Sequence, residues 1–279
     1  MQLVRLALVS ALTCFGCSDD DAPTSDGGGR DTGIDSARDA PGVDAPDTDT
    51  GGGTIHPQIL AFIRGDAARS LTVEIDSVPG AEPSAAVTSS FGDVLDEVLD
   101  KPGGIEFVED GTLPTRGDMP WTLGELQSLA TNNESLALAS DATRLHLLFV
   151  DGEFMIRNVI GLVVSTHAIV VFREVLDDVC SGAVINPLMR DQLCDVAEVT
   201  VLTHEMGHAI GLVNAGLPMV TDHEDPDRAK HDVDSNCVMY FAFQGSGVGD
   251  LLGSLGGGSP EPVGFCAPSL ADIAAVRDR

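Results

Sequence analysis

The chain is poor in basic and aromatic residues. Its 279 residues include 44 Asp and Glu against 15 Lys and Arg, which gives a net charge of −29, and only one Trp and one Tyr. An acidic surface repels phosphate, so this composition argues against nucleic acid as a partner; bound divalent ions or cationic groups fit better. We expect a soluble folded part that acts as a monomer.

Two kinds of metal site are also disfavoured by what is missing. The four cysteines that follow residue 53, Cys180, Cys194, Cys237 and Cys266, include no CxxC pair, which argues against a zinc site built from these thiols. It has no EF-hand spacing of acids either, although one stretch is rich in them: Asp222, Glu224, Asp225 and Asp227. A solvated loop explains these acids better than a structural calcium site, which stays as the alternative.

The first sixteen residues contain Arg5 and an apolar run that is too short to span a bilayer, as in a secretory signal. The run ends at Gly16 and Cys17 and resembles the bacterial lipoprotein signal, in which the cysteine is lipidated and becomes the new N-terminus. An ordinary signal peptide cut near Gly16 is the alternative. The resemblance implies an exported protein anchored in the bacterial cell envelope by lipid on Cys17, with Ser18 favouring the outer membrane.

Residues 17–53 form the next segment. From Ser18 to Gly53 there are ten Asp against two Arg and almost no large apolar side chain. Such a segment cannot bury enough surface to fold, so we predict a disordered acidic tether. Residues 54–279 have the patterns of one folded domain.

The folded part alternates strands with helices. Strands are predicted at 71–76, 105–110, 144–152, 158–165 and 167–174, and helices at 89–100 and 121–130, because apolar residues recur with periods of two and 3.6 respectively. A further helix is predicted to start at Asp195, capped by its carboxylate, or earlier at Asn186, and to end at Gly211. A last helix is predicted from Ser269. This order indicates an α+β fold with helices packed on a mixed sheet.

The sequence HEMGHAIG, His204 to Gly211, carries the chemistry. On a helix, His204 and His208 differ by about 40° in direction, so both imidazoles can reach one ion. Two neutral imidazoles suit zinc, and Glu205 between them can take a proton from a water molecule that the metal activates.

These residues resemble the metzincin clan of zinc peptidases, whose motif is HExxHxxGxxH or HExxHxxGxxD followed by a methionine turn. His204, Glu205, His208 and Gly211 match, and CVMY resembles the turn, with Met239 beneath the metal. The resemblance implies a twisted mixed five-stranded sheet, a zinc-binding helix and a C-terminal helix. It also implies an edge strand along the cleft, for which HAIVVFRE, His167 to Glu174, is our candidate.

The third zinc ligand departs from the pattern, because Asn214 stands where a His or Asp is expected. In matrixin-like members the third histidine lies eight residues before the turn methionine, which is the spacing of His231 and Met239. HDVDSNCVM also resembles the archaemetzincin arrangement HCxxxxCxM, with Asp232 in place of the first cysteine. An insertion of about seventeen residues before His231 accounts for both. We predict His204, His208 and His231 as ligands, with His223 and then Asn214 as alternatives.

The remaining cysteines and histidines are assigned to structure. Cys180, Cys194, Cys237 and Cys266 allow three pairings; we favour Cys180 with Cys194 and Cys237 with Cys266, since each closes a short loop around the candidate site. With Cys17 lipidated, no free cysteine is expected to bind the zinc and keep the enzyme inactive. His56, His146 and His167 are predicted to be structural, and Tyr240 to be a buried aromatic beside the turn.

The sequence therefore predicts a lipid-anchored zinc endopeptidase that acts on peptides or proteins, with Glu205 as the catalytic base. GLVNAGLPM after the zinc helix resembles bacterial lipid-anchored metalloproteases. The alternative is an envelope binding or scaffold lipoprotein that has kept a structural zinc site.

Overall fold

The computed structural model describes residues 54–117, 119–183, 189–245, 248 and 261–279. The predicted signal, Cys17 and the tether lie outside these residues. Within them, no helix combines the length and the apolar character needed to cross a membrane.

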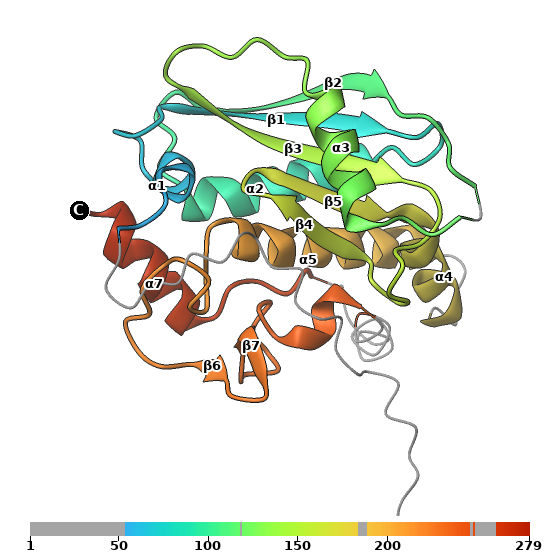
Figure 1. Ribbon diagram of the computed structural model, residues 1–279. Coiled ribbons are helices and arrows are strands. Elements are labelled where there is room, and N and C mark those ends of the chain that lie inside the picture. The colour runs from blue at the N-terminus through green and yellow to red at the C-terminus, as the bar shows by residue number, and fades with distance from the viewer. Residues whose placement is uncertain (1–53, 118, 184–188, 246–247, 249–260) are drawn as a thin grey trace, which may run out of the picture. The chain divides into compact units, whose positions relative to one another are not determined.

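A five-stranded sheet forms the centre of the described part (Figure 1). Its order is β2 (Ile105–Thr112), β1 (Ser70–Ser77), β3 (Ala142–Val150), β5 (Ala168–Phe172) and β4 (Gly161–Ser165). The first four strands run parallel, and β4 runs antiparallel to β5. This confirms the predicted α+β fold with a mixed five-stranded sheet.

The predicted edge strand was wrong. His167 to Glu174 contains β5, which lies inside the sheet, between β3 and β4. All five residues of β5 are buried, as expected of a strand covered on both faces. A tight turn after β4 sends the chain back between β4 and β3, so the earlier strand, β4, becomes the edge.

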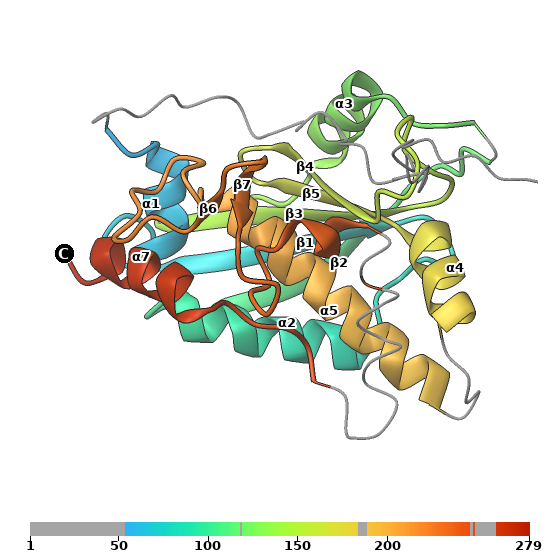
Figure 2. The same ribbon diagram turned by 90° about the horizontal axis from the view of Figure 1, so that it is seen from below.

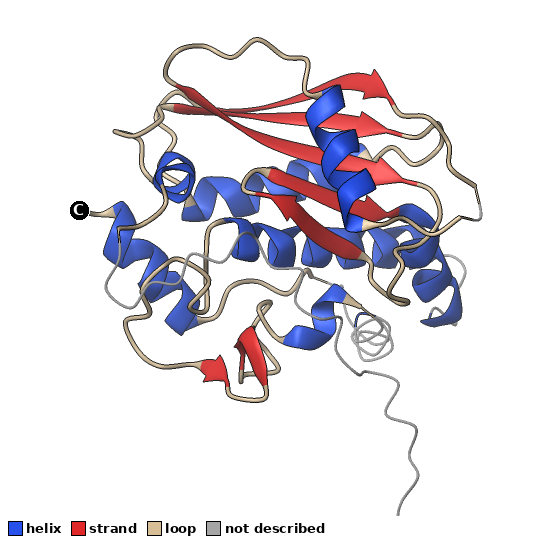
Figure 3. Ribbon diagram, viewed as in Figure 1, coloured by secondary structure: helices blue, strands red, loops and turns tan. Residues whose placement is uncertain are grey.

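Two long helices, α2 (Ala85–Val98) and α5 (Arg190–Ala209), lie side by side against one face of the sheet, whereas α3 (Leu123–Asn133) lies on the other (Figures 2 and 3). Helix α2 begins after Ser84, whose hydroxyl accepts the N–H of Val87. Helix α3 begins with a capping box between Thr122 and Glu125. Covering both faces buries the central strands almost completely.

Two shorter helices, α1 (Pro57–Ile63) and α7 (Ala267–Arg277), pack against each other (Figure 2). The ammonium of Lys101 lies at the end of α1 and donates to the carbonyls of Ala61, Arg64 and Ala68, at 2.7, 3.2 and 2.8 Å. Ala61 lies in the last turn of α1 and Arg64 is its C-cap, so Lys101 bonds the carbonyl end of the helix to the segment that follows it. Helix α7 begins two residues before Ser269, which is buried rather than capping.

Helix α5 starts between the two predicted positions, at Arg190. Asp195 does not cap it, because the carboxylate of Asp195 accepts the hydroxyl of Ser84 at 2.9 Å. Glu198 does not reach back either; it is buried and pairs with Arg173 at 2.8 Å. Burial raises the pKa of Glu198 to about 7, against the opposing effect of Arg173. Both acids tie α5 to its neighbours.

One of the two predicted disulfides is present. Cys237 and Cys266 are bonded. Cys180, in α4 (Arg173–Ala183), and Cys194, in α5, are instead two free thiols. The favoured pairing of Cys180 with Cys194 was therefore wrong, although the packing of α4 on α5 does bring their side chains together.

Candidate metal centre

Two of the three histidines come from the buried half of α5. Every residue of this helix from Val196 to Ala209 is buried, except His208, which is half-buried. His204 and His208 lie one turn apart, and their Nε2 atoms point at each other at 3.1 Å. Two nitrogens bound to one tetrahedral zinc ion are about 3.4 Å apart, so this separation suits a shared ion.

The third histidine arrives on a separate hairpin. The strands β6 (Glu224–Asp225) and β7 (Arg228–Asp232) form it, and His231 is the fourth residue of β7. The ring of His231 lies 5.4 Å from that of His204 and 5.0 Å from that of His208, centre to centre. One nitrogen from each ring falls within 4.8 Å of the others, so the three residues could hold a metal ion together.

Backbone carbonyls fix which ring nitrogens face the cluster. The Nδ1 of His204 donates to the carbonyl of Val238 at 2.6 Å, and the Nδ1 of His231 donates to that of Ala229 at 3.0 Å. A carbonyl can only accept, so Nδ1 carries the proton in each neutral ring and Nε2 presents a lone pair. Metal-binding histidines are usually oriented in this way.

Burial also keeps the cluster neutral. It lowers the pKa of His204 to about 3, helped by the nearby His231 and opposed by the bond to Val238. The pKa of His208 lies well below its ordinary value, because of burial and of the charges that His204, His231 and Lys230 would carry. Neutral imidazole is the form that binds a metal, so the site needs no deprotonation near neutral pH.

Glu205 lies beside the cluster, against strand β4. Its carboxylate is buried, and its Oε1 has no hydrogen-bond partner. Burial raises the pKa of Glu205 to about 8, while the backbone N–H of Val163 acts in the opposite direction. A buried carboxyl oxygen without a partner is costly unless a cation or a substrate supplies one. The donor set and this oxygen both fit a metal ion.

Met239 lies under the helix that carries the two histidines. The approach is close, since a Cβ built on Gly207 would fall 2.1 Å from the sulfur of Met239. The same turn supplies the Val238 carbonyl to His204, and the N–H of Asp232 donates to the carbonyl of Met239 at 2.9 Å. The turn therefore joins α5 to the end of β7.

The alternative ligands are not brought to the cluster. The amide of Asn214 donates to Glu224 at 3.1 Å, on the surface. Both ring nitrogens of His223 are engaged by carboxylates, Nδ1 by Asp232 at 2.6 Å and Nε2 by Asp272 at 2.9 Å. The acids at 222–227 do not form a candidate metal group among the described residues. The calcium alternative has no support there.

Another set of metal-ligating types, Glu74, Asp76 and His146, lies on strands β1 and β3. His146 pairs with Asp76 at 2.7 Å, and Glu74 pairs with Arg144 at 2.7 Å. Glu74 also accepts the N–H groups of Ser135 and Leu136. Because the guanidinium of Arg144 already neutralises Glu74 and would repel a cation, these residues stabilise the fold, as predicted for His146.

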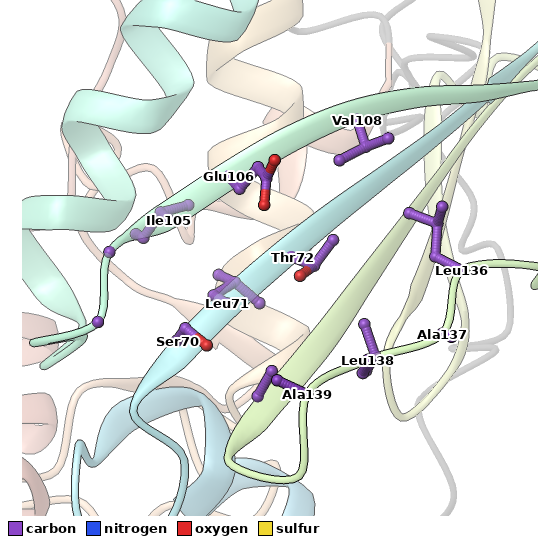
Figure 4. A pocket seen from close by; sticks show the side chains of 13 residues that line it. Ser70, Leu71, Thr72, Ile105, Glu106, Val108, Leu136, Ala137, Leu138 and Ala139 are labelled. Carbon is purple, nitrogen blue, oxygen red and sulfur yellow. The ribbon is translucent and has the colours of Figure 1, made fainter.

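A hollow of about 400 Å³ lies elsewhere, between strands β1 and β2 and residues 136–139 (Figure 4). Its walls are small and apolar side chains, with Thr72 and Glu106 among the few polar ones. No histidine, cysteine or residue of α5 lines it. It therefore lacks the groups that the histidine cluster has.

Two contacts at the site were not predicted from the sequence. Gly161 touches Glu205, and Asp272 touches His223. The contact of Gly161 had a signal in the sequence: a glycine within an otherwise apolar strand often marks a place where another segment approaches the backbone closely. The second had no signal, because Asp272 falls in an ordinary amphipathic helix pattern.

No family model and no curated protein matches the chain. Two solved structures are similar to it. One is archaemetzincin from Methanopyrus kandleri, with 17% identity and a TM-score of 0.49, covering 76% of this chain and 97% of that chain. The other is a zinc-dependent peptidase from Methanocorpusculum labreanum, with 16% identity and a TM-score of 0.46, covering 73% and 99%. What the histidine cluster does is therefore inferred from its own residues.

Proposed function

We propose that this chain is a zinc-dependent endopeptidase, with His204, His208 and His231 as the zinc ligands and Glu205 as the general base. One observation carries the proposal: three neutral imidazoles from α5 and β7 converge, beside a buried carboxylate whose Oε1 has no partner. A purely structural zinc site has no use for that carboxylate. The resemblance of HEMGHAIG and CVMY to the metzincin clan supports the same assignment.

Each residue then has a distinct part in peptide hydrolysis. His204, His208 and His231 would hold the zinc ion, which would supply Lewis acidity toward a carbonyl and lower the pKa of a bound water. Glu205 accepts a proton from the attacking water and delivers it to the leaving amine nitrogen. The carbonyls of Val238 and Ala229 hold the rings of His204 and His231 in orientation. Gly161 brings β4 into contact with Glu205.

The edge strand β4 is our candidate for binding the substrate. Among the strands of the described residues it pairs with β5 alone, and its first residue touches Glu205. An extended peptide could add to its open edge through main-chain hydrogen bonds, which would place a peptide bond next to the catalytic carboxylate.

The variant Glu205→Gln tests the reaction. It should keep zinc and lose cleavage of a peptide library by at least about a hundredfold, because the amide cannot take the proton. Glu97→Gln, an exposed change on α2, is the matched control. Undiminished cleavage by Glu205→Gln would refute the mechanism. A zinc-loaded wild type that cleaves no peptide would favour the binding or scaffold lipoprotein.

Zinc content tests the ligand set separately. The wild type should bind one zinc ion per chain, His231→Ala should lose it, and Asn214→Ala should retain it. A His231→Ala variant with full zinc and unchanged affinity would show that another residue is the third ligand.

We also propose that Cys17 carries lipid and anchors the chain to the bacterial envelope. The support comes from the signal-like first sixteen residues and the acidic tether that follows. Mass spectrometry of the mature N-terminus in a bacterial host should find a lipidated Cys17, and Cys17→Ser should release the protein from membranes. An unmodified N-terminus near Gly16 would support an ordinary signal peptide.

A further inference from the structure

A buried imidazole lies between two carboxylates next to the metal centre. The Nδ1 of His223 is 2.6 Å from Asp232, and its Nε2 is 2.9 Å from Asp272. The side chains of the three residues are 5%, 1% and 0% exposed. A carboxylate oxygen accepts, so both ring nitrogens donate and the ring is a cation. One imidazolium thus bridges two buried anions.

This trio joins the two ends of one hairpin, nine residues apart, to a helix that is distant in the sequence. His223 lies in the stretch between Gly211 and His231, Asp232 directly follows His231 on β7, and Asp272 lies on α7. Asp272 also accepts the N–H of Val220, so it holds the stretch at a second point. The other oxygen of Asp232 accepts the N–H of Asp234 at 2.8 Å.

The strand that carries His231 is held by contacts outside the main sheet, among them Arg228 over the ring of Phe241 at 3.6 Å and the N–H of Lys230 on Glu224 at 2.7 Å. Strand β7 is outside the main sheet, and within the described part of the chain it pairs only with β6, which is two residues long. The backbone of Asp232 is held by Met239, and its carboxylate by His223. A hairpin of this size is marginal by itself, so the bonds of Asp232 contribute to the position of β7.

We propose that the Asp232–His223–Asp272 trio is a clamp that positions His231 against the two histidines of α5. His223 is then a positioning residue for the metal centre, and the inference rests on the proposed zinc site. Without the imidazolium, Asp232 and Asp272 are two buried anions with no cation between them, and they repel each other. Strand β7 shifts to let water reach them, and His231 moves with it.

The experiment compares two buried histidines. His223→Gln removes the cation of the clamp. His146→Gln removes the other buried imidazole that pairs with a carboxylate, Asp76 at 2.7 Å, on strands β1 and β3. Zinc affinity is measured by competition with a chromophoric chelator, and the ligand geometry by the absorption spectrum of the cobalt-substituted protein.

We expect His223→Gln to weaken zinc binding by about tenfold, as for other residues that orient metal ligands, and to change the cobalt spectrum. His146→Gln should keep the affinity and spectrum of the wild type, even though its thermal midpoint falls. The second variant is Asp272→Asn, at a residue that contacts neither β7 nor a proposed zinc ligand. Like His223→Gln, it should weaken zinc binding and change the cobalt spectrum. Because the trio acts as a unit, the double variant should bind little more weakly than His223→Gln.

Wild-type affinity and spectrum in both His223→Gln and Asp272→Asn would overturn the clamp. An equal loss of affinity in His146→Gln would also overturn it, since stability alone would then explain the effect. A wild type that takes up no stoichiometric zinc would instead refute the proposed function, and the clamp with it.

Discussion

The backbone of Gly161 lies directly against the side chain of Glu205. A Cβ built on Gly161 would fall 2.7 Å from Cγ and 3.0 Å from Oε1 of Glu205, and 2.7 Å from Val201. Residues 201 and 205 are one turn apart on α5, so the glycine fits into a groove of the helix. The position of the Glu205 carboxylate, our proposed general base, is therefore coupled to the start of the edge strand.

Gly161→Ala should displace Glu205 and lower the turnover number by about a hundredfold, the effect of moving a catalytic group by roughly 1 Å. Zinc affinity should stay unchanged, since the neighbours of a Cβ at Gly161 are Glu205 and Val201 and not the three proposed ligands. Peptide cleavage and zinc titration on the same sample measure both. The control is Gly124→Ala on α3, where a Cβ meets nothing within 4 Å. Normal turnover in Gly161→Ala would disprove the coupling.

Gly207→Ala should destabilise the protein, although alanine favours helices by about 1 kcal/mol over glycine. The new Cβ would lie 2.1 Å from the sulfur of Met239 and 3.1 Å from Phe265, both packed under α5. Overpacking of this kind costs about 1–3 kcal/mol, so the cost of the clash exceeds the gain in helix propensity. Chemical denaturation measures the loss, and Gly207→Ala with Met239→Ala should recover part of it. A more stable Gly207→Ala would show that Met239 can move aside.

The stability of the metal-free protein should depend on pH through His223. Burial lowers the pKa of His223, but the bonds from Asp272 and Asp232 outweigh it, so the pKa is raised overall. Those two carboxylates are the charged groups that face the ring, from α7 and β7. A raised pKa means that this stabilisation is full below about pH 6.5, the unfolded value, and is lost as the pH rises through the folded value.

The difference in unfolding free energy between the wild type and His223→Gln isolates this contribution, because the buried Glu198 and other acids titrate in both. The difference should be largest in mild acid and shrink in mild alkali. A difference that grows with pH would mean that the ring is neutral when folded.

Loss of the Cys237–Cys266 bond should cost about 3–4 kcal/mol, from the chain entropy of a loop with a separation of 29 residues. The variant with alanine at both positions should show this loss in chemical denaturation. A reductant should lower the midpoint of the wild type and leave that of the double variant unchanged, because Cys180 and Cys194 are already thiols. Because Cys180 is buried, alkylation is carried out on the unfolded, unreduced protein, where it should label Cys180 and Cys194. Labelling of neither cysteine would show that they form a second disulfide.

The local features of the site could be predicted from the sequence, and its long-range contacts could not. The spacing of His204 and His208 follows from helix geometry, and the distance from His231 to Met239 indicated a third histidine. The edge strand was predicted wrongly because β4 and β5 are both apolar. Their hydrophobic patterns do not indicate which of the two lies inside the sheet and which lies at its edge. The start of α5 was mistaken because Asp195 and Glu198 have the sequence of a capping box, whereas the fold uses them to bind Ser84 and Arg173.

The bonds of Lys101 have a practical consequence for labelling this protein. The chain contains two lysines, Lys101 and Lys230. The ammonium of Lys101 is held by three carbonyls and shielded from solvent. An amine-reactive dye or cross-linker therefore attaches at Lys230 or at the chain's amino terminus. Since Lys230 directly precedes His231, a fluorophore placed there reports on the rim of the metal centre without any engineered residue.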